Sequence, residues 1–201
     1  MLRVGHRGAP ALAPPNTIEG VRAALAVGVD MIEFDVSPGM VVAHDRGRPG
    51  PHLEAFLDEL AELLPPQVGL MVDLKTTGYE RAALRAVERA GLAERAVFAT
   101  LELPSIRLLA GEARTSFSFN RRRPGRAAPL LRRVAVRAWQ RSGATDATIR
   151  HTLASPALVE AVHGHGGRVF AWTVNSPAGV QRVRSLGVDG IITDDPRLLN
   201  E

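Results

Sequence analysis

Short apolar runs alternate with longer amphipathic stretches along the whole chain. Runs of strand type lie at residues 3–6, 31–36, 69–74, 95–100, 115–119, 147–151, 168–174 and 189–194. Helical patterns separate most of them, at residues 17–28, 52–64, 79–92, 103–113, 155–167 and 176–188. Strand–helix alternation with short connections predicts a parallel sheet. Eight such strands predict an α/β protein, a compact (β/α)8 TIM barrel that forms one domain over residues 1–201, with a doubly wound sheet as the alternative.

One stretch departs from this alternation. The segment MIEFDVSPGMVVAHD, residues 31–45, holds two apolar runs separated only by SPGM. Four residues cannot contain the crossover helix that a parallel strand needs, so a short antiparallel hairpin is predicted after the second strand. Only RGRPGPH then separates Asp45 from the next helical pattern, which leaves no room for an inserted subdomain.

The composition limits the chemistry that is available. The chain has 201 residues, 45% of them hydrophobic, and no cysteine. Disulfides, cysteine metal sites and a thiol nucleophile are excluded. Any metal must be held by Asp, Glu or His, which favours hard cations such as Mg, Ca or Mn. Because there is neither a membrane-length apolar run nor a signal-peptide pattern, a cytoplasmic protein without stable membrane insertion is predicted.

The basic charge is almost entirely arginine. The net charge is +4, and Lys75 is the single lysine. Residues 120–143 are the most basic segment, and they would allow peripheral contact with anionic lipid or nucleic acid. The simpler interpretation is an arginine-rich loop followed by an outer barrel helix with a solvated face, and we prefer it. Few aromatic residues interrupt the arginines, which argues against a nucleic-acid partner.

Carboxylates occupy the second strand, where apolar residues are expected. Side chains alternate along a strand, so Glu33 and Asp35 share one face. In a barrel that face points inward at the carboxyl end of the strand, where active sites of this fold lie. Two buried carboxylates repel each other unless a cation lies between them or one of them binds a proton. A divalent metal is the simplest partner.

Other strand ends carry polar side chains that complete such a site. They are His6 and Arg7 after the first strand, His44 in the hairpin, Asp73 and Lys75 on the third, Trp172 on the seventh and Asp194 after the eighth. Together they offer a third carboxylate for a cation besides Asp194, two histidines for proton transfer, two cations for an anion and a flat aromatic surface. Taken singly, His44 could merely cap a hairpin, Trp172 could be a core residue, and Asn175 and Asn16 could be helix N-caps.

Six stretches contain these residues. They are HRG at 6–8 with NT at 16–17, IEFDV at 32–36, VVAHD at 41–45, DLK at 73–75, AWTVN at 171–175 and GVDGIITDDP at 187–196. In order and extent they resemble the glycerophosphodiester phosphodiesterase family, which has the TIM-barrel phosphodiesterase fold. The resemblance spans nearly the whole chain.

The resemblance implies a role for each residue. It implies an enzyme that hydrolyses small-molecule glycerophosphodiesters to an alcohol and glycerol 3-phosphate, in lipid and glycerol metabolism. The implied metal ligands are Glu33, Asp35 and Asp73, binding Mg or Ca, with Mn also possible. The implied acid–base pair is His6 and His44. The implied phosphate and substrate contacts are Arg7, Lys75, Trp172 and Asp194.

Three features depart from the family pattern. Pro15 stands where the family usually has Glu, Asp73 where it usually has Glu, and the turn and connection around His44 are short. The open rim leaves two alternatives: a phospholipase D-like phosphodiesterase or lyase that acts on lysophospholipids, and a non-catalytic phosphodiester-binding relative. Neither the head group nor the oligomeric state follows from the sequence.

Overall fold

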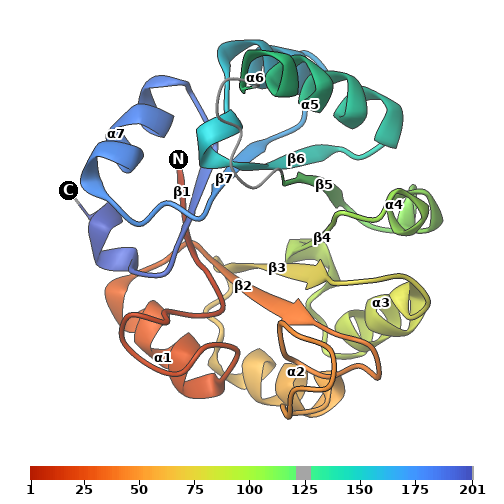
Figure 1. Cartoon of the computed structure of the whole chain (residues 1–201). Coiled ribbons are helices and arrows are strands. Elements are labelled where there is room, and N and C mark those ends of the chain that lie inside the picture. The colour runs from red at the N-terminus through yellow and green to blue at the C-terminus, as the bar shows by residue number, and fades with distance from the viewer. Residues whose placement is uncertain (121–127, 201) are drawn as a thin grey trace.

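A computed structural model describes residues 1–120 and 128–200, in which eight parallel strands close into a barrel (Figure 1). The strands are β1 (Leu2–Gly5), β2 (Met31–Val36), β3 (Gly69–Leu74), β4 (Ala96–Thr100), β5 (Thr115–Phe119), β6 (Asp146–Arg150), β7 (Val169–Trp172) and β8 (Gly190–Thr193). Each strand pairs with its neighbour in sequence, and β1 pairs with β8. The predicted TIM barrel is confirmed, and the doubly wound alternative is wrong because the sheet has no open edge.

Helices form a ring around the strands (Figure 1). They are α1 (Ile18–Val27), α2 (Leu53–Leu63), α3 (Glu80–Arg89), α4 (Leu103–Leu109), α5 (Ala128–Ser142), α6 (Pro156–His163) and α7 (Pro177–Ser185), with short 3-10 turns at Ala93–Arg95, His151–Leu153 and Pro196–Leu199. Thr17 caps α1 by accepting a hydrogen bond from the Gly20 backbone, and Gly28 ends that helix at φ 87°. Among the described helices, none has the length and apolar character to cross a membrane.

The alternation of side chains along each strand divides the core into two layers. Inside the barrel, Val4, Met31 and Met71 pack with their counterparts from other strands. The opposite faces pack against the helices: Phe34 of β2 contacts Phe56 of α2, with ring centroids 5.0 Å apart. Glu33 and Asp35 therefore share the inward face with Met31, as the period of two predicts.

The predicted hairpin is reduced to a tight antiparallel turn. Ser37 and Val41 exchange backbone hydrogen bonds of 2.8 and 3.3 Å, but residues 42–45 form no strand. The Ser37 hydroxyl donates to the Ala43 carbonyl at 2.6 Å, which keeps the chain turning instead of extending beside β2. The helical part of the basic segment is confirmed as α5, whereas residues 121–127 lie outside the described part of the chain.

Candidate active site

A cavity of about 620 Å³ opens at the carboxyl ends of the strands. Seven of the nine predicted site residues line it: His6, Arg7, Glu33, His44, Asp73, Lys75 and Trp172. A second cavity, of about 720 Å³, lies at the other end of the barrel around Met31 and Gly69, the first residues of β2 and β3. None of the nine predicted site residues lines it. The seven lining residues therefore gather at the end of the barrel where TIM barrels carry their active sites.

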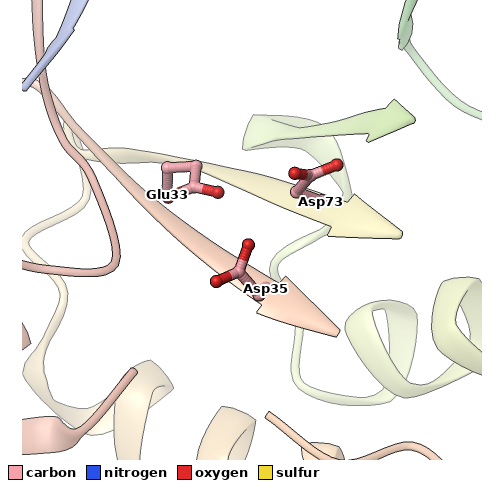
Figure 2. Close-up of side chains that lie close together, drawn as sticks. All are labelled: Glu33, Asp35 and Asp73. Atoms are coloured by element: carbon pink, nitrogen blue, oxygen red, sulfur yellow. The ribbon is translucent and has the colours of Figure 1, made fainter. Parts of the chain in front are cut away.

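Three carboxylates meet at the base of the first cavity: Glu33 and Asp73 line it, and Asp35 is fully buried beside them. Glu33 and Asp35 come from β2 and Asp73 from β3, where the parallel register places Asp73 directly beside Asp35. One oxygen of each carboxylate lies within 4.8 Å of the others (Figure 2). Glu33 and Asp35 are buried, and Asp73 is partly exposed to the cavity.

This concentration of negative charge divides the carboxylates into two kinds. Burial and then the charge of Asp35 raise the pKa of Glu33 to about 7. Burial also opposes ionisation of Asp35, but the positive charges of Lys75 and Arg7 outweigh it and lower the pKa of Asp35. Near neutral pH, Asp35 is ionised while Glu33 is poised between its two forms.

The donor set fits a hard divalent cation. Lys75 Nζ lies 2.5 Å from Asp35 Oδ1 and 2.5 Å from Asp73 Oδ2, so its ammonium group compensates part of the charge. Three carboxylates, one of them with a pKa raised by burial and by like charge, form an oxygen-rich cradle of the kind that Mg, Ca or Mn occupies.

Arg7 joins the first strand to this cradle. Its backbone adopts φ 53°, and its N–H donates to Glu33 Oε2 at 2.7 Å. Its side-chain Nε lies 2.8 Å from Asp35 Oδ2. Gly8 follows with φ 86°, and a Cβ there would lie 2.5 Å from the backbone of Gly20. The HRG turn is thus shaped so that one residue contacts two carboxylates.

Asn16 is a site residue that the sequence interpretation missed. Its amide donates to Asp35 Oδ2 at 2.9 Å, and its Oδ1 accepts from the Asp35 backbone N–H at 3.0 Å. The residue is buried and has φ 60°, a conformation that Asn tolerates better than most residues. Thr17 is the helix cap, so the Asn16 side chain is free to orient Asp35.

His6 lies between two acidic groups. Its Nδ1 is 2.5 Å from Asp194 Oδ1, and its Nε2 is 4.0 Å from Glu33 Oε2. Burial lowers the pKa of His6, but the charge of Glu33 and the hydrogen bond to Asp194 outweigh that effect and raise the pKa overall. Asp194 does not line the cavity; it contacts the site through His6.

Asn175 holds Asp194 in turn. Its amide Nδ2 donates to Asp194 Oδ2 at 2.5 Å, and its Oδ1 accepts from the Asp194 backbone N–H at 3.0 Å. The N-cap interpretation of Asn175 is wrong, because Ser176 caps α7 by accepting from Gly179. The position directly before the cap lets the Asn175 side chain turn back toward β8.

His44 stands at the rim of the cavity, apart from the buried groups. Its ring is exposed, and its Nδ1 lies 2.7 Å from Asp45 Oδ1. That hydrogen bond lowers the pKa of Asp45. The other ring nitrogen remains available to a ligand in the cavity.

Tyr79, which the sequence interpretation also missed, contacts the backbone of Lys75. The phenol oxygen accepts from the backbone N–H groups of Lys75 at 3.1 Å and Thr76 at 3.3 Å. It donates to the Val36 carbonyl at 2.6 Å. One hydroxyl therefore connects the ends of β2 and β3, the two strands that carry all three carboxylates.

Two histidines outside the cavity have local partners. His163 Nε2 lies 2.8 Å from Asp189 Oδ2, and His165 Nδ1 lies 2.9 Å from the Ala161 carbonyl. They do not line the cavity that holds His6 and His44.

The chain matches the model of the Glycerophosphoryl diester phosphodiesterase family over residues 6–47 and 51–198. The chain belongs to this family. The glycerophosphodiester phosphodiesterase of Caldanaerobacter subterraneus subsp. tengcongensis is 26% identical, and the match covers 98% of this chain and 96% of the relative. The expectation of a phosphodiesterase enzyme is confirmed at the level of the family, and enzymes of this family generally depend on a divalent metal.

Solved structures share the barrel. A glycerophosphodiester phosphodiesterase from Parabacteroides distasonis superposes with a TM-score of 0.76 at 20% identity, covering 96% of this chain and 92% of the other. A phosphodiesterase from Oleispira antarctica was solved in complex with the product sn-glycerol-3-phosphate. It superposes with a TM-score of 0.70 at 20% identity, covering 98% of this chain and 96% of the other. At this identity the likeness establishes the fold.

Proposed function

We propose that this chain hydrolyses glycerophosphodiesters to an alcohol and sn-glycerol 3-phosphate in a metal-dependent reaction with two histidines as acid and base. The observation that carries the proposal is that Glu33, Asp35 and Asp73 meet within 4.8 Å at the base of a cavity lined by His6 and His44. Family membership supports the reaction class, and the Oleispira antarctica complex with sn-glycerol-3-phosphate supports the product. A cytoplasmic location and roles in lipid and glycerol metabolism stay predictions.

The three carboxylates would hold the cation, with Mg or Ca as the first candidates and Mn as the third. When bound, such a cation supplies Lewis-acid polarisation of a phosphoryl oxygen. Lys75 and Arg7 place two further positive charges at the base of the same cavity, where they would stabilise the charge that develops on the phosphoryl group. An arginine presents a planar set of donors that matches phosphate oxygens.

Proton transfer is assigned to the two histidines. Asp194 holds Nδ1 of His6, which leaves Nε2 to take a proton from the attacking oxygen. His44 at the open rim would give a proton to the leaving alcohol, which can then depart into solvent. The attacking oxygen belongs either to water or to a neighbouring hydroxyl of the substrate, and the second route passes through a cyclic phosphate.

The deciding experiment measures release of glycerol 3-phosphate from a panel of glycerophosphodiesters in Mg, Mn, Ca or EDTA. We expect turnover that EDTA abolishes and that Asp73→Asn and His44→Ala each reduce by at least about 100-fold. Asp58→Asn on the exposed face of α2 and His52→Ala, whose side chain is exposed outside the cavity, serve as matched controls. Folded protein without turnover in any metal would refute the proposal.

A lysophospholipid substrate is the second candidate. Leu101 lines the cavity with 52% of its surface exposed, and the described connection from β2 to α2, which carries His44, contains no inserted subdomain. An apolar side chain at an open mouth suits an acyl chain. Product analysis separates the candidates, because a phospholipase D-like reaction leaves the acyl chain on the phosphate product. Tight substrate binding without turnover would instead indicate a non-catalytic relative in which Pro15 has replaced a needed carboxylate.

A further inference from the structure

Three polar side chains line the cavity on the side away from the carboxylates. They are Asn120, Arg150 and Trp172, at the carboxyl ends of β5, β6 and β7. The register places Arg150 beside Trp172, and it pairs the preceding residues of β5 and β6, so Asn120 follows next to Arg150. In a closed barrel of eight strands, β6 lies opposite β2, which carries Glu33 and Asp35. We call these three residues the β6 wall.

Each residue of the β6 wall has a buried polar atom without a hydrogen-bond partner among the described residues. The atoms are Oδ1 of Asn120, Nε of Arg150 and Nε1 of Trp172. Buried polar side-chain atoms are nearly always paired, so three neighbouring exceptions at one cavity need an explanation. Two of the three are N–H donors, and the Asn120 amide offers a further N–H group from its other atom. Three neighbouring residues that carry N–H donors on one side of the cavity match a ligand with acceptor oxygens.

The lack of acidic partners around Arg150 also favours an anionic ligand. No ion pair joins Arg150 to a carboxylate in the part of the chain that the structure describes. Asp146 is the single acidic residue between positions 113 and 159, which contain ten arginines. Asp146 is fully buried at the start of β6, where it already pairs with Arg114 and Arg168. It therefore cannot neutralise the mouth of the barrel.

A neighbouring histidine reports the same positive field. His151 follows directly after Arg150, and burial together with the charges of Arg150 and Arg182 lowers the pKa of His151. Cationic groups that face a cavity without a local counter-ion raise the local concentration of anions.

We propose that the β6 wall is a second anion subsite, which takes a carboxylate or phosphate group carried by the alcohol substituent of the phosphodiester. The subsite rests on the proposed function, because it assigns the phosphodiester itself to the carboxylate side of the same cavity. Arg150 supplies the charge, and Asn120 and Trp172 supply neutral donors at either side. The preferred substrates are then glycerophosphodiesters whose head group bears its own anion.

The test compares binding within two matched substrate pairs. Glycerophosphoglycerol phosphate differs from glycerophosphoglycerol by a phosphate, and glycerophosphoserine differs from glycerophosphoethanolamine by a carboxylate. Titration calorimetry with the His44→Ala variant measures the affinities while turnover is slow. We expect at least one acidic member to bind about tenfold tighter or more, as one charge-assisted contact provides. Arg150→Gln should bring that ratio close to one, and Arg150→Lys should keep part of it.

The matched control is Arg137→Gln, because Arg137 is exposed on α5 and does not line the cavity. It should leave the ratio as in the parent. Equal affinities in both pairs would overturn the subsite, as would a preference that survives Arg150→Gln in protein with an unchanged circular dichroism spectrum. A preference confined to one pair assigns the subsite to that anion. Failure of the proposed function is seen separately, as absence of turnover of all four compounds by the parent enzyme.

Discussion

Nδ1 of His6 and Oδ1 of Asp194 lie 2.5 Å apart, although the two residues belong to opposite ends of the chain. Closure of the barrel through β1 and β8 brings them together. The contact fixes which ring nitrogen of His6 faces the cavity, and Asn175 fixes Asp194 in the same way. The histidine proposed as the base is thus oriented by a carboxylate that does not itself line the cavity.

Replacement of Asp194 by Asn should change the pH dependence of the reaction. Burial lowers the pKa of His6, while the charge of Glu33 and the hydrogen bond that His6 donates to Asp194 raise it, so loss of the Asp194 charge lowers the pKa of His6. Because His6 must be unprotonated to act as a base, the acid limb of the kcat/KM profile should move to lower pH, with kcat reduced about 10- to 100-fold. Profiles recorded at saturating metal would show this.

The neighbouring Asp195 offers the control for this measurement. Its side chain accepts from the Arg197 backbone as a cap of the last 3-10 turn, and Asn preserves that role. Asp195→Asn should leave the acid limb in place. An unmoved limb in Asp194→Asn would exclude Asp194 as the residue that orients and charges His6.

Glu33 should destabilise the metal-free protein at high pH. The folded pKa is raised from 4.5 to about 7 by burial and by Asp35, so ionisation is harder in the folded state than in the unfolded chain. Below the pKa of the unfolded chain, Glu33 is neutral in both states and does not affect the free energy of unfolding. The destabilisation grows as the pH rises above that pKa and is complete above pH 7. Its size is at most about 3 kcal/mol.

Glu33→Gln removes this charge and keeps an acceptor for the Arg7 N–H. In EDTA, the variant should unfold at a higher temperature than the parent at pH 8 and at nearly the same temperature at pH 4. Added Mg, Ca or Mn should raise the melting temperature of the parent and leave that of the variant almost unchanged. A variant that is less stable than the parent at pH 8 would show that Glu33 is not under like-charge repulsion.

Two substitutions of Asn16 separate the free-energy cost of backbone strain from the cost of lost hydrogen bonds. Asn16→Gly keeps the φ of 60° without strain but loses both bonds to Asp35, which should cost about 1–3 kcal/mol. Asn16→Ala loses the same bonds and also places a Cβ in the left-handed region, which adds about 1 kcal/mol or more. Urea denaturation of both variants measures the two contributions. A glycine variant as stable as the parent would mean that Asp35 needs no support from Asn16.

The sequence predicted the features that depend on side-chain alternation along one strand and on residues at the ends of strands. Glu33 and Asp35 share the inward face because alternation along one strand requires it, and Asp73 joins them because neighbouring parallel strands end at the same edge. The barrel followed from the count of strand–helix units. These inferences need no knowledge of which residues meet across the chain.

The missed residues depend on contacts that no local pattern contains. Asn16 and Asn175 both stand where a helix cap is expected, and only the paths of the β1–α1 and β7–α7 connections decide that their amides bind Asp35 and Asp194. The predicted hairpin keeps its antiparallel pairing only at Ser37 and Val41, and beyond it the Ser37 hydroxyl binds the Ala43 carbonyl across the turn. A side-chain hydrogen bond of this kind competes with strand pairing and leaves no periodic signal.

Tyr79 provides the last test, because its role is positional. Burial raises the pKa of its phenol, so the hydroxyl stays protonated and donates to Val36 while it accepts from Lys75. Tyr79→Phe leaves the Thr76 N–H without that acceptor, while the Lys75 N–H keeps its 3.0 Å hydrogen bond to the Val36 carbonyl, and should cost about 1–2 kcal/mol in urea denaturation. Because Lys75 would lose one of the contacts that position it beside Asp35 and Asp73, kcat should fall several-fold while the metal still binds. Lys75→Gln, which removes the charge itself, should lower kcat much further; equal losses in the two variants would mean that Tyr79 does more than position Lys75.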